Sequence, residues 1–284
     1  MAAPTYEDIW TYAHQVQGIS QQARDAFLVT AQEVDFTDWE QAAEQLRQIV
    51  YTIAEAYGLA SGELGAQWYE YCRAMKYDSR YTAIVGTPSR YGLKSDANNV
   101  IDKLFAGQLT TDAFVSMLAG VVVDNVQRRA RDVILDNLDI EYKAAVARGD
   151  RKMAGEIGYA RVPQGDACAF CVMLASRGFV YRSEYSATHT KWGSKYHNNC
   201  TCEAVPFAKA REIKGYGDRL EHYSDMYYDA RRMWKSGMPE ELEKRIAEAK
   251  ADHAQKIADG QASDPWSDDN EITIVMRWMN PGLK

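Results

Sequence analysis

Five residues that could bind one metal ion lie close together in the sequence: Cys168, Cys171, His197, Cys200 and Cys202. Thiolates and imidazoles are the ligands that zinc prefers, and C-x-x-C spacing brings two sulfurs to the same side of a tight turn. H-x-x-C does the same with an imidazole. Because a closed tetrahedral site needs four ligands, one candidate is spare. We favour the first four, with Cys202 as the spare or substitute ligand.

Other kinds of cysteine chemistry fit less well. A redox C-x-x-C would need a thioredoxin-like βαβ setting, and a zinc deaminase would need an upstream H-x-E and a proline before Cys168; the sequence has neither pattern. A catalytic zinc would need a nearby general base, and neither Glu184 nor Glu203 lies in a motif that makes it one. Disulfides would need an oxidising compartment and stay open as an alternative. We therefore expect a structural zinc site and no catalytic residues.

Composition and charge narrow the class of protein. The chain has 284 residues, 46% of them hydrophobic, and a net charge of −7, which argues against a dedicated nucleic-acid binder. Its first residues lack a secretory pattern, and its most apolar stretch, 113–123, is far shorter than the roughly 20 residues that span a bilayer. We expect a protein that folds in a cytoplasm, where Cys72 is a small buried hydrophobe.

The fold class that we predict is mainly α (α+β), beginning with a helical body over residues 1–160. The clearest helix covers 37–57, where Thr37 and Glu40 form a capping box, apolar residues recur at three- and four-residue steps, and Gly58 follows as a terminator. We expect other helices at 6–16, 20–34 and 61–76, and from Thr111 onward. Residues 77–97 read as a loop or extended arm. Arg128, Arg129 and Arg131, interleaved with acids, predict a solvated helix face.

Two further regions follow the helical body. Residues 161–207 form the Cys/His module, with short strands expected at 178–183 and 203–207. This module is too small for a large core of its own, so a metal staple would stabilise it. Residues 208–284 return to helix, at 216–234 and from Pro239 to about 257, with an exposed connector at 261–269.

The Cys/His module resembles a known family. Its motifs are Arg161-Val-Pro-x-Gly165, then Cys168-Ala-Phe-Cys171, then Tyr196-His197-x-x-Cys200-x-Cys202. They resemble the phage Mu F-like minor head proteins, in particular those of tailed phages of actinobacteria. The resemblance implies a low-copy structural protein of the virion head that contacts the portal or the major capsid protein during assembly and genome packaging. It implies no enzymatic activity, no membrane partner and no small-molecule substrate.

A second interpretation is a zinc-dependent nucleic-acid or nuclease-like module that acts on phage DNA. The module contains four basic residues and one tryptophan that could contact phosphates and bases: Arg177, Arg182, Lys191, Lys195 and Trp192. Asp166, Glu184 and Glu203 dilute this charge. Weak contact with packaged DNA therefore stays open beside the structural role.

Overall fold

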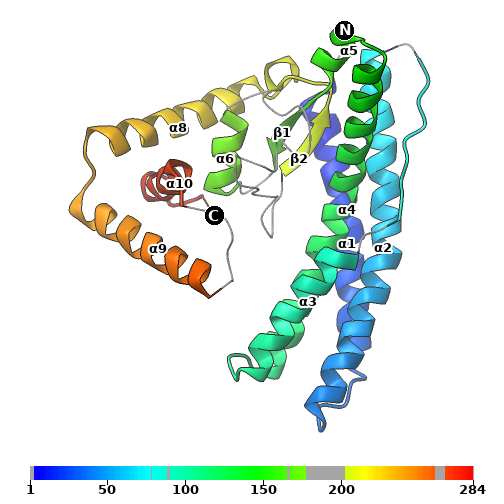
Figure 1. The fold of residues 1–284 in the computed structure, drawn as a ribbon, viewed down its shortest axis with the longest axis vertical. Coiled ribbons are helices and arrows are strands. Elements are labelled where there is room, and N and C mark those ends of the chain that lie inside the picture. Colours follow the sequence, from blue (N-terminus) through cyan, green and yellow to red (C-terminus); the bar gives the residue numbers. More distant parts are fainter. Residues whose placement is uncertain are drawn as a thin grey trace. The chain divides into compact units, whose positions relative to one another are not determined.

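The computed structural model describes residues 3–77, 79–87, 90–164, 167–176, 202–259 and 266–283. These residues are mainly helical, which confirms the predicted class (Figure 1). The chain divides into two compact units, which we name the helical unit (Trp10–Asn137) and the sheet unit (Met1–Ile9 with Leu138–Lys284). None of the described helices is both long and apolar enough to cross a membrane. The predicted division at 160/161 and 207/208 stays a prediction.

Four long helices build the helical unit. They are α1 (Tyr6–Ala31), α2 (Trp39–Lys76), α3 (Arg90–Phe105) and α4 (Thr111–Ala147), of which α1 and α4 continue into the sheet unit. Their apolar faces share one core that includes Phe27, Leu46, Val50, Phe114 and Leu118. The apolar stripe predicted on residues 37–57 is therefore confirmed. The two short helices predicted at 6–16 and 20–34 are wrong, because one helix covers both.

Helix α2 begins and ends elsewhere than predicted. Its N-cap is Asp38, whose carboxylate accepts hydrogen bonds from the amides of Glu40 (3.0 Å) and Gln41 (3.1 Å). The predicted capping box at Thr37 is therefore wrong. The helix also continues through Gly58 to Lys76, so the helix predicted at 61–76 is its second half.

The glycines of α2 mark close packing rather than a helix end. A Cβ on Gly65 would lie 2.4 Å from the backbone oxygen of Ala130 in α4, and one on Gly62 would lie 3.3 Å from Nε of Arg129. A glycine lets two backbones approach where any side chain would collide. Contact with α4 thus explains why α2 contains several glycines and yet continues as one helix to Lys76.

The segment between α2 and α3 is held by side chains from α2 and α4. Asn137 accepts a hydrogen bond from the Ile84 amide (2.8 Å) and donates one to the Ile84 carbonyl (2.9 Å). Glu70 accepts from the Ala83 amide (2.7 Å), and Arg129 donates to the carbonyls of Val85 and Gly86. Residues 79–87 are therefore fastened along α2 and α4, not extended as an arm. Because α3 begins at Arg90, the loop is also shorter than the predicted 77–97.

The arginines of α4 do not form the predicted solvated face. Arg129 and Arg131 are only 7% and 4% exposed, and Arg128 forms an ion pair with Asp96 at 3.3 Å. The guanidinium of Arg129 supplies donors to a loop whose carbonyls would otherwise lack partners, and buried polar groups need such partners. The mixed charge pattern wrongly predicted a solvated face because Arg129 and Arg131 are buried and Arg128 is paired with Asp96.

The sheet unit contains a two-stranded antiparallel sheet among its described residues. Strand β1 (Tyr159–Pro163) pairs with β2 (Cys202–Pro206), with Tyr159 opposite Pro206 and Pro163 opposite Cys202. This confirms the strand predicted at 203–207 within one residue; the strand predicted at 178–183 lies outside the described residues. Short helices α5 (Arg151–Glu156), α6 (Ala169–Ser176) and the 3-10 turn η1 (Ala210–Glu212) flank the strands.

Three helices complete the sheet unit: α8 (Gly217–Ser236), α9 (Glu240–Ala258) and α10 (Asp268–Met279). The first two confirm the helices predicted at 216–234 and from Pro239. Helix α10 begins with a capping box between Ser267 and Asn270, inside the segment that we predicted as a connector up to 269. Helix α10 packs on α8 and α6.

Candidate metal centre

The C-x-x-C motif forms the first turn of helix α6. The helix begins at Ala169, and the carbonyl of Cys168 accepts its first backbone hydrogen bond, from Val172 at 3.0 Å. The amide of Cys171 donates to Sγ of Cys168 at 3.3 Å. Cys168 thus occupies the capping position, where a side-chain acceptor satisfies an amide of the first turn. Amide dipoles at this end of a helix stabilise negative charge, as on a thiolate ligand.

The third candidate ligand among the described residues comes from the sheet. Cys202 is the first residue of β2 and lies opposite Pro163 of β1. Cys171 and Cys202 are buried and pack against each other, and the half-buried Cys168 packs against both. The structure therefore brings together three of the five predicted ligands, including the one that the sequence ranked as spare.

The other two predicted ligands, His197 and Cys200, lie outside the described residues, as does the segment 177–201 around them. Within the described ranges no group of three or more His, Cys, Asp or Glu side chains is arranged to hold a metal ion by itself. The donor chemistry of the three cysteines fits zinc, which needs a fourth ligand beyond them. The complete ligand set stays a prediction.

The cysteine helix is well packed, in part against helices outside the Cys/His module. Residues 171–175 of α6 are all buried, and the helix contacts β1, α8 and α10. Both strands are buried along their whole length. Helices α8 and α10, which lie outside residues 161–207, thus supply the core that this segment lacks alone. The metal staple stays a prediction.

Buried tyrosines lie beside the cysteine cluster. Tyr216 is fully buried and stacks on Tyr6 with ring centroids 5.8 Å apart, and the Arg219 guanidinium lies 4.9 Å from the Tyr6 ring. Burial raises the pKa of Tyr216, and nearby Tyr223 and Cys202 raise it further. Burial also raises the pKa of Tyr223, against a hydrogen bond from Arg219. Both phenols are therefore neutral at physiological pH.

Two buried charged residues belong to the two-stranded sheet. Arg161, the first residue of the Arg-Val-Pro motif, lies in β1 opposite Ala204, and Glu203 lies in β2 opposite Val162. They are 1% and 5% exposed. Burying charge is costly unless it is compensated, so these side chains have a structural role in the unit. Glu203 is accordingly placed in the interior of the sheet unit.

Comparison with known proteins gives the family. The sequence profile of the VG15 protein matches residues 3–230, from the start of α1 into α8, and so includes the cysteine cluster. This chain belongs to the VG15 protein family. The family consists of viral and phage gene products, and the match indicates a phage-encoded protein. No curated protein and no solved structure matches the chain.

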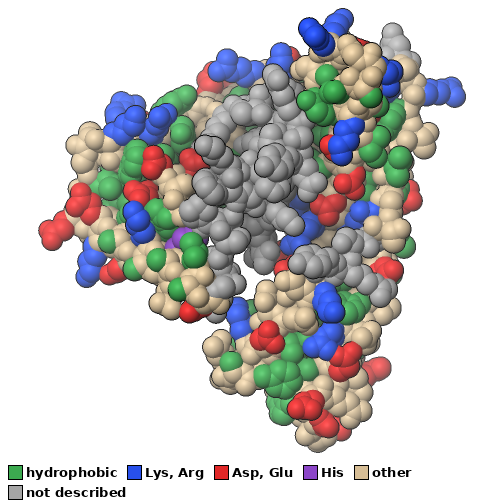
Figure 2. Space-filling view, in the orientation of Figure 1, with side chains coloured by type: hydrophobic (Ala, Val, Ile, Leu, Met, Phe, Trp, Pro, Cys, Tyr) green, Lys and Arg blue, Asp and Glu red, His purple; other side chains and the backbone are tan. Residues whose placement is uncertain are grey.

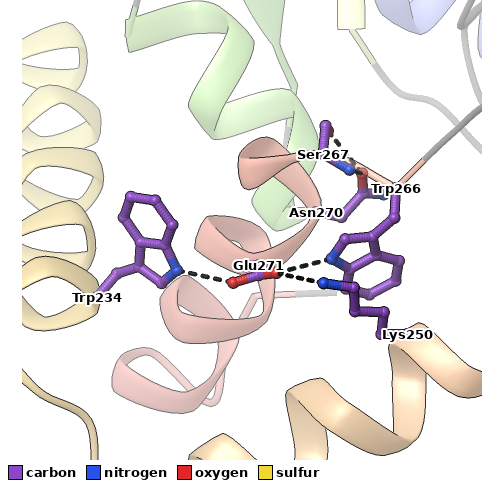
Figure 3. A network of polar contacts seen from close by, with 6 residues as sticks. All are labelled: Trp234, Lys250, Trp266, Ser267, Asn270 and Glu271. Carbon is purple, nitrogen blue, oxygen red and sulfur yellow. Dashed lines mark hydrogen bonds and ion pairs between the residues drawn. The ribbon is translucent and has the colours of Figure 1, made fainter.

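A polar network lies beyond the VG15 match and was not predicted. The carboxylate of Glu271 in α10 accepts hydrogen bonds from the indole N–H groups of Trp234 and Trp266, both at 2.9 Å (Figure 3). Lys250 of α9 approaches the same carboxylate at 3.9 Å. The network ties α8, α9 and α10 together. The tryptophan partners of Glu271 have no local signature in the sequence.

Proposed function

We propose that this VG15-family protein is a structural minor capsid protein of a tailed phage that acts in head morphogenesis. The observation that carries the proposal is membership of a family of phage proteins over most of the chain. The narrower likeness of its cysteine motifs to Mu F-like minor head proteins supports a place at the portal or the inner capsid. The proposed role is not enzymatic, and its partners are the portal or the major capsid protein.

The fold is suited to a scaffold of this kind. Helices of 26, 38 and 37 residues share one apolar core, and Gly65 lets α2 and α4 pack in direct contact. Close packing makes such an interior resistant to deformation. A body of this stiffness can hold a binding surface in a fixed place within an assembly.

A binding assay with purified components tests the proposed role. The full chain is mixed with the portal protein and, separately, with the major capsid protein encoded by the same phage, and complexes are detected by size-exclusion chromatography with light scattering. We expect a stable complex with one of the two. Binding to neither, together with a gel shift of phage DNA that declines steeply with salt, would favour the nucleic-acid interpretation instead.

We further propose that the cysteine cluster holds a structural zinc ion, with ligands from Cys168, Cys171, His197, Cys200 and Cys202. Zinc would cross-link α6, β2 and the segment that precedes β2. Elemental analysis should find about one zinc per chain. Cys168→Ser should lower both zinc content and thermal stability. Cys72→Ser is the matched control, because Cys72 is buried in α2 of the helical unit; it should leave zinc content unchanged. A metal-free protein with intact disulfides would contradict the proposal.

A further inference from the structure

An open groove runs between the end of α1 and the start of α2 in the helical unit. Its volume is about 460 Å³. Val34 and Ile49 are only partly buried and give it an apolar floor. The remaining lining residues are polar and exposed: Thr30, Glu33, Gln41, Glu44, Gln45 and Gln48. An apolar floor between polar rims is the form of a groove that accepts one face of an amphipathic helix.

Acidic residues predominate in the chain around this groove. No lysine or arginine occurs between Arg24 and Arg47, whereas six carboxylates do: Asp25, Glu33, Asp35, Asp38, Glu40 and Glu44. Hydrogen bonds from the amide and hydroxyl of Thr37 hold the pKa of Asp35 below its usual value, which keeps that carboxyl ionised. In Figure 2 acidic side chains gather with hydrophobic ones at the lower end of the helical unit. The field there favours a cationic partner.

Large apolar side chains stay exposed beside the groove residues. Val29, which precedes Thr30 in α1, is 64% exposed, and Trp39 at the start of α2 is 39% exposed. The Trp39 ring lies 5.4 Å from that of Phe36. Aromatic residues of this kind are common anchors at protein interfaces, where burial of their area contributes most of the binding energy.

We propose that this groove binds a cationic amphipathic helical segment of another protein. The apolar face of the segment would cover Val34 and Ile49, and its lysines or arginines would reach Glu33 and Glu44. The ion pair that Glu44 makes with Arg47, and its hydrogen bond from Gln48 at 2.8 Å, hold that carboxylate at the rim. A second copy of this chain is a poorer occupant, because each copy carries a net charge of −7. The inference does not depend on the head-assembly role.

A defined peptide probe tests the inference. A fluorescein-labelled peptide of about 14 residues, four helical turns with leucines on one face and lysines on the other, is titrated with the full chain at 0.15 M salt. Fluorescence anisotropy should show saturable binding. The same peptide with glutamates in place of the lysines should not bind. Absence of saturable binding by the lysine peptide, or equal binding of both peptides, would overturn the proposal.

Reversing charges at the groove rim tests whether the peptide binds at the groove or is attracted only by the net charge of the protein. Glu33→Lys with Glu44→Lys should raise the Kd for the lysine peptide at least about ten-fold. Glu240→Lys with Glu243→Lys makes the same change in net charge at exposed positions of α9 and should raise the Kd much less. Circular dichroism checks that both variants are folded. Equal weakening by the two variants would refute the groove, as would self-association of the wild type that the rim variant abolishes.

Discussion

Replacing Gly65 by alanine tests the idea that glycines in α2 exist for contact with α4. Gly65 is buried in the middle of α2, and an added Cβ would lie 2.4 Å from the backbone oxygen of Ala130. Carbon and oxygen atoms normally approach to about 3.3 Å or more. Because the colliding atom belongs to the backbone, it cannot rotate away. The two helices would have to separate by about 1 Å, with loss of packing along the interface.

Two opposing effects set the size of the change. Alanine favours a helix interior over glycine by about 0.8–1.0 kcal/mol. Overpacking of a tight core costs typically about 1–3 kcal/mol, and a backbone collision belongs at the upper end. The net loss should be about 2 kcal/mol. For a chain of this size that corresponds to a fall in Tm of about 4–8 °C.

Thermal and urea unfolding followed by circular dichroism measure the effect, and Gly18→Ala is the matched control. Gly18 lies inside α1, and a Cβ there would meet nothing within 4 Å. Only the propensity effect remains, so this variant should be stabilised by about 0.5–1 kcal/mol. The two substitutions should therefore move stability in opposite directions. A Gly65→Ala protein as stable as the wild type would refute the assigned role of the glycine.

Three further predictions concern polar groups that are buried or partly buried. Asn137→Ala removes the hydrogen-bond partners of the Ile84 amide and carbonyl and should destabilise the fold by roughly 2–4 kcal/mol. Amide hydrogen exchange over residues 79–87 should become faster. Unchanged exchange would contradict the idea that Asn137 holds this segment. Glu271→Gln leaves only one acceptor oxygen for two indole donors and should cost about 1–3 kcal/mol, with shifted tryptophan fluorescence; an unaltered spectrum and stability would argue against the network. Burial raises the pKa of Tyr216, so the stability that it contributes is complete below the pKa of about 10 of an unfolded tyrosine and is lost as pH rises above it. Urea unfolding at a series of alkaline pH values should show this fall, reduced in Tyr216→Phe; an identical fall in both proteins would contradict it.

The helical fold class and the approach of Cys168 to Cys171 could be predicted from the sequence. Apolar periodicity in α2 reports which face is buried, because a regular helix places residues three and four apart on one side. C-x-x-C spacing likewise predicts that two sulfurs approach each other. The position of Cys202 beside them depends on the pairing of β2 with β1, which the spacing alone does not contain.

What could not be predicted depends on contacts distant in sequence. Gly58 looked like a helix end because glycine has a low helix propensity, but packing against α4 overrides that local preference. Strand β1 carries no alternating pattern, since every residue of it is buried. Asn137 clamps Ile84 from 53 residues away, and no local pattern pairs a side-chain amide with one peptide group of a distant loop.

Quantitative mass spectrometry of purified phage heads is the most direct test of the proposed role. The phage that encodes this chain is grown, procapsids and mature heads are separated on gradients, and the protein is quantified against the major capsid protein. The head-assembly account predicts that the protein is present in procapsids, mature heads or both, at few copies relative to the shell. Its absence from both particles would contradict the account.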